Sequence, residues 1–278
     1  MPKINILIRH YRISRIVIHT FIGLAIAAIA LPMLNKQHKL AIIKWWCGGL
    51  LRAFHIKVST FGTLPPANTQ GVMFVANHVS WSDIHALNSM IPLRFIAKSD
   101  IKSWPIFGYL VTQANTLFID RNKRQEAGRI VQMTAESLIA GDNLCFFPEG
   151  TTSDGSGSDG SGSDGSGSDG SGSDGAGTEG RQVLPFKSSV LQAAIDANTR
   201  IWPVALQYVN ADGSINTEMA YAGDISLIDS MNQIINQKNA LIELHFLAPI
   251  QAADYDRRGL TAAAYQAISA KLTSLRGL

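Results

Sequence analysis

The sequence contains only two cysteines, which argues against two classes of small, cross-linked domain. Cys47 and Cys145 lie far apart in apolar surroundings, and they provide neither a disulfide framework nor the close pairs of a zinc site. Motifs for metals, nucleotides and nucleic acids are also lacking, and the basic residues are scattered between apolar blocks. We therefore expect no metal, and no nucleic acid as a partner.

Charge is distributed unevenly along the chain. Six acidic residues lie in one Gly/Ser tract that contains no Lys or Arg: Asp154, Asp159, Asp164, Asp169, Asp174 and Glu179. The whole chain has a net charge of +3, but the rest of it sets 24 basic residues against 15 acidic ones, a net charge of +9. A folded body of that charge suits anionic lipid surfaces and phosphorylated substrates.

The same tract lacks any large apolar residue. From Ser153 to Gly177 it consists of five tandem copies of Ser-Asp-Gly-Ser-Gly, the last of which has Ala for the second Ser. A calcium-binding β-roll needs a large apolar residue in each repeat, and the EF-hand spacing also fails. We expect residues 153–180 to form a disordered loop inserted in the folded domain, with no part in the chemistry.

Two apolar segments occupy the N-terminus. Ile16 to Leu34 is almost continuously apolar and would form a helix about 28 Å long, close to the hydrocarbon thickness of a bilayer. Leu40 to Phe54 carries Trp45 and Trp46 beside basic residues, a pattern that suits an interfacial helix. We assign residues 1–57 to membrane-anchoring helices.

Strand-like and helix-like runs alternate in residues 58–278. This pattern predicts an α/β domain whose mixed, largely parallel sheet is flanked by helices. The expected strands are Val72–Ala76, Arg94–Ala97, Thr116–Ile119, Leu144–Phe147, Trp202–Val209 and Leu241–Leu247. The expected helices are Asp83–Met90, Lys123–Ala140, Ser188–Ala197 and Thr261–Leu275.

A histidine and an aspartate five positions apart follow the first of these strands. His78 and Asp83 lie in Asn77–Asp83, where a strand gives way to a helix, and α/β sheets bind their ligands at such a junction. A carboxylate that fixes the tautomer of an imidazole makes it a better proton acceptor. The pair is therefore a candidate general base with its orienting acid, although a surface His near an Asp is common.

Further blocks follow downstream: Leu117–Arg121, Leu144–Thr152 (which contains Phe-Pro-Glu-Gly-Thr), Val183–Lys187 and Ile201–Leu206. With the His-x4-Asp block, in this order and spacing, they resemble the glycerolipid acyltransferase family, which includes the lysophosphatidic acid acyltransferases. The resemblance covers roughly Phe74 to Leu206. It implies that His78 removes the proton of an acceptor hydroxyl and that Asp83 holds the imidazole. His85 matches nothing in the family pattern, and we interpret it as a bystander.

The resemblance also suggests how an acceptor is bound. Arg121, with Lys123 and Arg124 behind it, suits a phosphate group, since a guanidinium binds phosphate through two nitrogens. Without the resemblance, a surface ion pair with Asp120 would be the preferred interpretation. Glu149 matches a block used for acceptor binding and would accept hydrogen bonds from a glycerol hydroxyl or pair with Arg121.

Three further residues complete the expected acceptor site. Gly150 belongs to the same block as Glu149, and Thr151 with the backbone amides around Gly150 is a candidate phosphate ligand. Lys98, after a strand, is a candidate for the phosphate or for the developing oxyanion. No Gly-x-Ser-x-Gly elbow follows a strand, which favours direct transfer over an acyl-enzyme.

We therefore expect a membrane-associated O-acyltransferase that needs no cofactor beyond its acyl donor, acyl-CoA or acyl carrier protein. Its partners are membrane lipids and a lysophospholipid acceptor, first of all 1-acyl-glycerol-3-phosphate, which would give phosphatidic acid. A different lysolipid such as lyso-ornithine lipid is an alternative acceptor. A non-catalytic, membrane-bound lipid-binding protein is the alternative from another class.

The N-terminus is open to three interpretations. A cleaved signal peptide would export the enzyme away from cytosolic acyl donors. A single span with basic residues on both sides leaves the orientation ambiguous. A helical hairpin that dips into one leaflet, with the catalytic domain on the cytoplasmic side of the inner membrane, fits the resemblance best.

Overall fold

One mixed sheet of eight strands forms the centre of the described part of the chain. The computed structural model describes residues 4–120, 126–154 and 183–277. In spatial order the strands are β1 (Ile56–Gly62), β7 (Ala240–Phe246), β6 (Arg200–Val209), β2 (Met73–Ala76), β5 (Leu144–Phe146), β3 (Arg94–Lys98) and β4 (Leu117–Ile119), with β8 (Ile250–Gln251) paired to β6. Strand β6 runs antiparallel to β7 and β8, and the other neighbours are parallel. The expected mixed, largely parallel sheet is confirmed.

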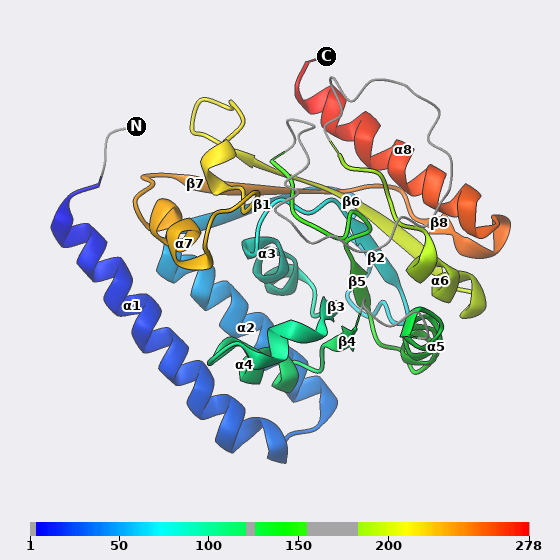
Figure 1. Cartoon of the computed structure of the whole chain (residues 1–278), viewed down its shortest axis with the longest axis horizontal. Helices are drawn as coiled ribbons and strands as arrows, with labels where there is room; N and C mark the ends of the chain where they lie inside the picture. The colour runs from blue at the N-terminus through cyan, green and yellow to red at the C-terminus, as the bar shows by residue number, and fades with distance from the viewer. Residues whose placement is uncertain (1–3, 121–125, 155–182, 278) are drawn as a thin grey trace.

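Helices cover both faces of this sheet (Figure 1). They are α1 (Ile6–Ala25), α2 (Lys36–Phe54), α3 (Ser82–Met90), α4 (Phe107–Gln113), α5 (Glu126–Ile139), α6 (Gln192–Asp196), α7 (Leu227–Ile235) and α8 (Arg257–Leu275). The four residues of β2 are fully buried and alternate between two cores. Phe74 packs in the core beneath α2, α3 and α7, whereas Met73 packs in the core beneath α5, α6 and α8. Burial on both faces explains why the central strands are continuous apolar runs.

Several elements differ from the sequence prediction. Helix α1 begins at Ile6 rather than Ile16, so that the basic residues before the apolar run belong to the helix. Strands β1 and β8 and helices α4 and α7 are additional. Strand β1 starts directly after His55, whose positive φ of 63° ends α2, and the expected domain start at residue 58 falls inside this strand. The described part of the expected helix Lys123–Ala140 is α5.

Helices α1 and α2 form an antiparallel hairpin. Helix α1 continues into a π-helical turn, Ile26–Ala30, and a 3-10 turn, Leu31–Met33, before the chain reverses. Gly23 permits close packing because a Cβ at this position would lie 2.2 Å from the indole nitrogen of Trp46. The Nε2 atom of His19 lies 2.8 Å from the carbonyl oxygen of Trp46, which ties the two helices together.

The hairpin is also attached to the α/β domain at two distant points. Near its start, the buried Arg12 guanidinium donates to the carbonyl oxygens of Ile235 and Gln237, at the end of α7, at 2.7 and 2.5 Å. Near its tip, the Lys36 ammonium lies 2.7 Å from the carboxylate of Asp142, which follows α5. The hairpin therefore lies along the domain, as Figure 1 shows, with α1 on the outside.

Within the described residues, one helical stretch, Ile6–Met33, is long and apolar enough to cross a membrane. Only 17% of its most apolar window is buried. Its exposed large side chains include Leu7, Val17, Ile18, Phe21, Ile29 and Met33. An uncovered apolar face of this size indicates association with a membrane.

Candidate active site

The turn from β2 into α3 holds the expected His–Asp pair. The Nδ1 atom of His78 lies 2.8 Å from Oδ2 of Asp83, in the first turn of α3. The same oxygen accepts the backbone N–H groups of Val79 and Ser80 at 2.7 and 2.9 Å, and Asp83 is completely buried. Because Nδ1 faces a carboxylate, it carries the imidazole proton, and Nε2 keeps the lone pair that a general base needs. The roles of both residues stay predictions.

Strand β6 supplies contacts to this turn that the sequence does not reveal. The side-chain amide of Asn77 exchanges two hydrogen bonds with the backbone of Leu206, each 2.8 Å long. The hydroxyl of Tyr208 donates to Oδ1 of Asp83, and Ser82 Oγ lies 2.8 Å from that hydroxyl. A tyrosine inside an apolar strand gives a weak signal, since most such residues only fill a core.

Glu149 lies beneath the catalytic turn, with both carboxylate oxygens occupied. One accepts the backbone N–H of His78 at 2.6 Å, and the other accepts that of Leu184 at 2.9 Å. The side chain is only 4% exposed. Burial, and to a lesser extent the charge of Asp83, raises the pKa of Glu149 to about 7. The hydrogen bonds from the backbone N–H groups of His78 and Leu184 oppose this rise. In this structure each oxygen of Glu149 accepts one backbone N–H, and its expected role in binding a glycerol hydroxyl stays a prediction.

The other expected acceptor residues fall into three groups. Gly150 has a positive φ of 75°, which favours glycine, and its N–H donates to the carbonyl of Phe147 at 3.1 Å. Thr151 and Lys98, like Gly150, line a cavity that His78 also lines. Arg121 lies outside the described residues, as do Lys123, Arg124 and all but the first two residues of the Ser/Asp/Gly tract.

That cavity has a volume of about 720 Å³. Its apolar wall comes from the hairpin and from α3, β3 and α4, and includes Ile26, Leu31, Ile43, Trp46, Phe95 and Leu110. Its polar part includes His78, Lys98, Asp100, Thr151, Thr152 and Asp224. A cavity with an apolar wall and a few convergent polar groups is typical of a site for an amphipathic ligand.

His85 also lines the cavity, between two tryptophans. Its Nδ1 atom lies 3.3 Å from the carbonyl oxygen of Trp81, in the same helix. Burial lowers the pKa of His85 to about 4, which the Trp81 carbonyl and Asp83 oppose in part, so the ring is neutral near pH 7. The imidazole of His85 forms part of the cavity wall, and its interpretation as a bystander in proton transfer stays a prediction.

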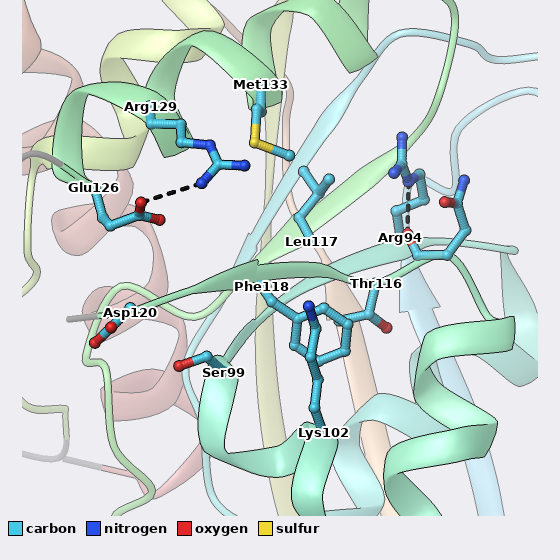
Figure 2. Close-up of a pocket in the computed structure, with 11 residues that line it drawn as sticks. Arg94, Ser99, Lys102, Thr116, Leu117, Phe118, Asp120, Glu126, Arg129 and Met133 are labelled. Atoms are coloured by element: carbon cyan, nitrogen blue, oxygen red, sulfur yellow. Dashed lines mark hydrogen bonds and ion pairs between the residues drawn. The ribbon is translucent and has the colours of Figure 1, made fainter. Parts of the chain in front are cut away.

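A second hollow, of about 470 Å³, lies between β4 and α5 (Figure 2). Its basic side chains are already engaged. Arg94 donates to Asn115, Ser137 and Asp142, Arg129 pairs with Glu126, and Lys102 lies over the ring of Phe118. In Figure 2 one dashed line joins Arg129 to Glu126, and the other marks the bond from Arg94 to the carbonyl oxygen of Asn115. Arg94 and Arg129 therefore already pair with carboxylates among the described residues, Asp142 and Glu126.

Among the residues that the structure describes, no group of three or more His, Cys, Asp or Glu side chains could hold a metal ion. The predicted independence from metals and cofactors stays a prediction.

Comparison with known proteins places the chain among lipid-modifying enzymes. A family model described as Acyltransferase matches residues 55–207. A 1-acyl-sn-glycerol-3-phosphate acyltransferase of Neisseria meningitidis is 35% identical over 210 residues, which cover 76% of this chain and 72% of that protein. A lyso-ornithine lipid O-acyltransferase of Pseudomonas aeruginosa is 30% identical over 227 residues, covering 82% and 76%.

A similar fold occurs in the crystal structure of the 1-acyl-sn-glycerophosphate acyltransferase of Thermotoga maritima. The TM-score is 0.68 at 17% identity, over 99% of this chain and 97% of that one.

Proposed function

This chain belongs to the acyltransferase family, and we propose that it transfers a fatty acyl group to the free hydroxyl of 1-acyl-glycerol-3-phosphate. The product would be phosphatidic acid, and the donor acyl-CoA or acyl carrier protein. The observation that carries the proposal is the His78–Asp83 pair, joined at 2.8 Å, with His78 in the lining of a cavity that has an apolar wall. That cavity offers a place for an acyl chain next to a proton acceptor.

In the proposed reaction the acceptor oxygen attacks the thioester carbonyl while Nε2 of His78 takes the hydroxyl proton. Asp83 stabilises the imidazolium that forms, through Nδ1. The new C–O bond forms as the C–S bond breaks, and the proton on His78 passes to the leaving thiolate. The reaction needs neither a covalent enzyme intermediate nor a redox partner.

The second candidate acceptor is a lyso-ornithine lipid. It is supported by the Pseudomonas aeruginosa relative and by the charges that line the cavity. The described residues that line it include two carboxylates, Asp100 and Asp224, and the ammonium of Lys98. Carboxylates suit an acceptor with an amino group, whereas Arg121, if it reaches the site as the sequence predicts, suits a phosphate.

We also propose that the hairpin lies in the plane of one leaflet, with the catalytic domain on the cytoplasmic side of the inner membrane. The contacts of Arg12 with α7 and of Lys36 with Asp142 support this arrangement. A hairpin held along the domain at both ends cannot cross a bilayer without breaking these contacts. Its outer face, which includes Ile18 and Phe21, is left for the acyl chains of the membrane.

An acyl-transfer assay on a panel of lysolipids tests the function. The purified full chain is given labelled acyl-CoA or acyl carrier protein with 1-acyl-glycerol-3-phosphate or lyso-ornithine lipid. We expect turnover with the phosphate acceptor, its abolition in His78→Ala and Asp83→Ala, and largely retained turnover in His85→Ala. Near-normal activity of His78→Ala would overturn the mechanism. Turnover with lyso-ornithine lipid alone would replace the first acceptor by the second.

A vesicle flotation assay tests the membrane arrangement. We expect Phe21→Glu to weaken binding to anionic vesicles, because a carboxylate is costly to place among acyl chains. Ile139→Glu is the matched control, since Ile139 is an exposed apolar residue on α5, 70% accessible against 64% for Phe21. Equal loss in both variants would count against a specific role of α1.

A further inference from the structure

The carboxylate of Asp83 is held from two sides. Its Oδ2 atom serves His78 and two backbone amides, whereas Oδ1 accepts the hydroxyl proton of Tyr208, which comes from the middle of the sheet. Since Tyr208 gives its proton to Asp83, the neighbouring hydroxyl of Ser82 donates to Tyr208, at 2.8 Å. A chain of hydrogen bonds therefore runs from Ser82 through Tyr208 to Asp83 and meets the imidazole there.

We propose that Tyr208 is a positioning residue of the acyl-transfer site, which sets the orientation and the basicity of Asp83 toward His78. The proposal rests on the proposed function of His78 as general base. Tyr208 itself touches no substrate atom in this scheme and acts only through the carboxylate.

The burial of the hydroxyl supports a specific role. Tyr208 is 2% exposed, and Ser82 and Asp83 are completely buried. A buried hydroxyl is costly unless it is hydrogen-bonded, so phenylalanine would fill this core position without that requirement. Burial, followed by the charge of Asp83, raises the pKa of Tyr208 well above its ordinary value. The phenol consequently stays a donor throughout the pH range in which an imidazole can act as a base.

The backbone of β6 supports the same turn two residues away. Both hydrogen bonds of the Asn77 side chain go to the backbone of Leu206, so β6 contacts the turn just before His78 and again at Asp83. Neighbouring β2 pairs with β6 in parallel register up to Ala76 and Val204. One rigid strand therefore fixes the ends of the His-x4-Asp segment relative to each other, which is the geometry that proton transfer requires.

Removal of the phenol hydroxyl has a predictable sign. In Tyr208→Phe, Oδ1 of Asp83 stays buried but loses its donor, and a carboxylate with fewer donors is a stronger base. The imidazolium is then held more strongly, so the general base is protonated over a wider range of pH. The acid limb of the kcat/KM profile should move to higher pH.

The kinetic test uses the full chain with each acceptor that the wild-type enzyme accepts. For Tyr208→Phe we expect kcat to fall by about 10- to 100-fold, because Asp83 no longer holds the imidazole in the reactive orientation, with KM for donor and acceptor almost unchanged. Tyr265→Phe is the matched control, because its hydroxyl lies 3.5 Å from the carbonyl of Val183, in the other core. An unchanged kcat and an unchanged acid limb in Tyr208→Phe would overturn the proposal.

A second readout needs no substrate, and so separates this proposal from the proposed function. Proton NMR of the selectively labelled full chain in detergent reports the Nδ1 proton of His78, which is shared with Asp83. We expect this resonance to move further downfield in Tyr208→Phe and to keep its position in Tyr265→Phe. A resonance that does not move in Tyr208→Phe contradicts the proposal, whatever the acceptor proves to be.

If Tyr208→Phe does not fold, Ser82→Ala tests the positioning role of Tyr208 in its place. This variant keeps the phenol and removes only the hydroxyl that donates to it. The acid limb should again move to higher pH and the Nδ1 resonance downfield, by less than in Tyr208→Phe. Wild-type values of the acid limb and of the Nδ1 resonance in a folded Ser82→Ala enzyme would then overturn the proposal.

Discussion

The imidazole ring of His78 lies flat against the ring of Phe147, with the centroids 4.0 Å apart and the planes inclined by 12°. Asp83 fixes the rotation of the imidazole through Nδ1, and Phe147 fixes its plane. Phe147 is itself stacked on Phe95, 5.9 Å away. The orientation of the proposed base is therefore determined by one hydrogen bond and one aromatic stack.

Loss of this stack should reduce turnover. Phe147→Leu keeps an apolar side chain beneath the imidazole but removes the aromatic face, which also stabilises the imidazolium formed in the reaction. We expect kcat to fall by about 3- to 10-fold, measured in steady-state acyl transfer. Phe186→Leu removes an edge-on aromatic contact, with Tyr265, and serves as the control for the loss of a phenylalanine ring. Equal kcat in Phe147→Leu and wild type would exclude a role of the stack.

Glu149→Gln distinguishes two roles of Glu149. A glutamine amide has one acceptor oxygen, so its NH2 group would face the backbone N–H of either His78 or Leu184. We expect kcat to fall by about 10-fold or more, with KM for the acceptor nearly unchanged. An increase in the acceptor KM at constant kcat would instead support the acceptor-binding role that the sequence predicted.

The protonation of Glu149 should also appear in the pH dependence of stability. The pKa of Glu149 is about 7 in the folded chain, against an ordinary value of 4.5, because burial outweighs its hydrogen bonds. Between these values the folded state holds more protons than the unfolded one, so the contribution of Glu149 to stability decreases as pH rises from about 4.5 to about 7. Above that range it is constant.

Thermal unfolding in detergent at several pH values measures this effect. Relative to wild type, the Tm of Glu149→Gln should rise steadily through the same window, because glutamine does not titrate. Glu218 is exposed, so Glu218→Gln is the control, and its Tm should differ from that of the wild type by the same amount at every pH. A difference in Tm between Glu149→Gln and wild type that does not change with pH would contradict this prediction. It would show that the Glu149 carboxyl has the same pKa in the folded and the unfolded state.

Shortening the Ser/Asp/Gly tract to one repeat should leave turnover nearly unchanged. Both sides of the tract are tied to the catalytic turn: the N–H of Ser153 donates to the carbonyl of His78 at 2.9 Å, and the N–H of Leu184 donates to Glu149. Loop closure depends weakly on length, so the anchors should hold in the shorter chain. A large loss of kcat, with the unfolding temperature maintained, would assign the tract a part in the reaction.

Local patterns in the sequence predicted most of the fold. Strands β2 to β7 are rich in apolar residues, and both ends of each lie within two residues of those expected. Strand β1 also shows alternation, with Ile56, Val58 and Thr60 on one face, but it follows the apolar α2 without a break and its partner β7 lies far along the chain. The apolar run that begins at Ile16 does not reveal the full length of α1, because its first turns contain basic residues such as Arg12, which donates to carbonyl oxygens at the end of α7.

The site was predictable only where its residues are close in sequence. His78 and Asp83 are five positions apart, and their bond follows from the strand-to-helix turn. Tyr208 reaches the same carboxylate across 125 positions, and nothing local separates it from an ordinary core tyrosine. The carboxylate of Glu149 accepts the backbone N–H groups of His78 and Leu184. Because every residue except proline has such a group, the residue types do not predict these bonds.

The anchors on both sides of the Ser/Asp/Gly tract have a practical consequence. We expect that the segment between Ser153 and Leu184 can be exchanged for another one, because these two anchors hold the catalytic turn. A fluorescent protein or an epitope placed between Asp154 and Val183 would report on the enzyme from beside its active site, without a fusion at the membrane-facing N-terminus. The chain thereby offers an internal attachment point for following this enzyme in a living cell.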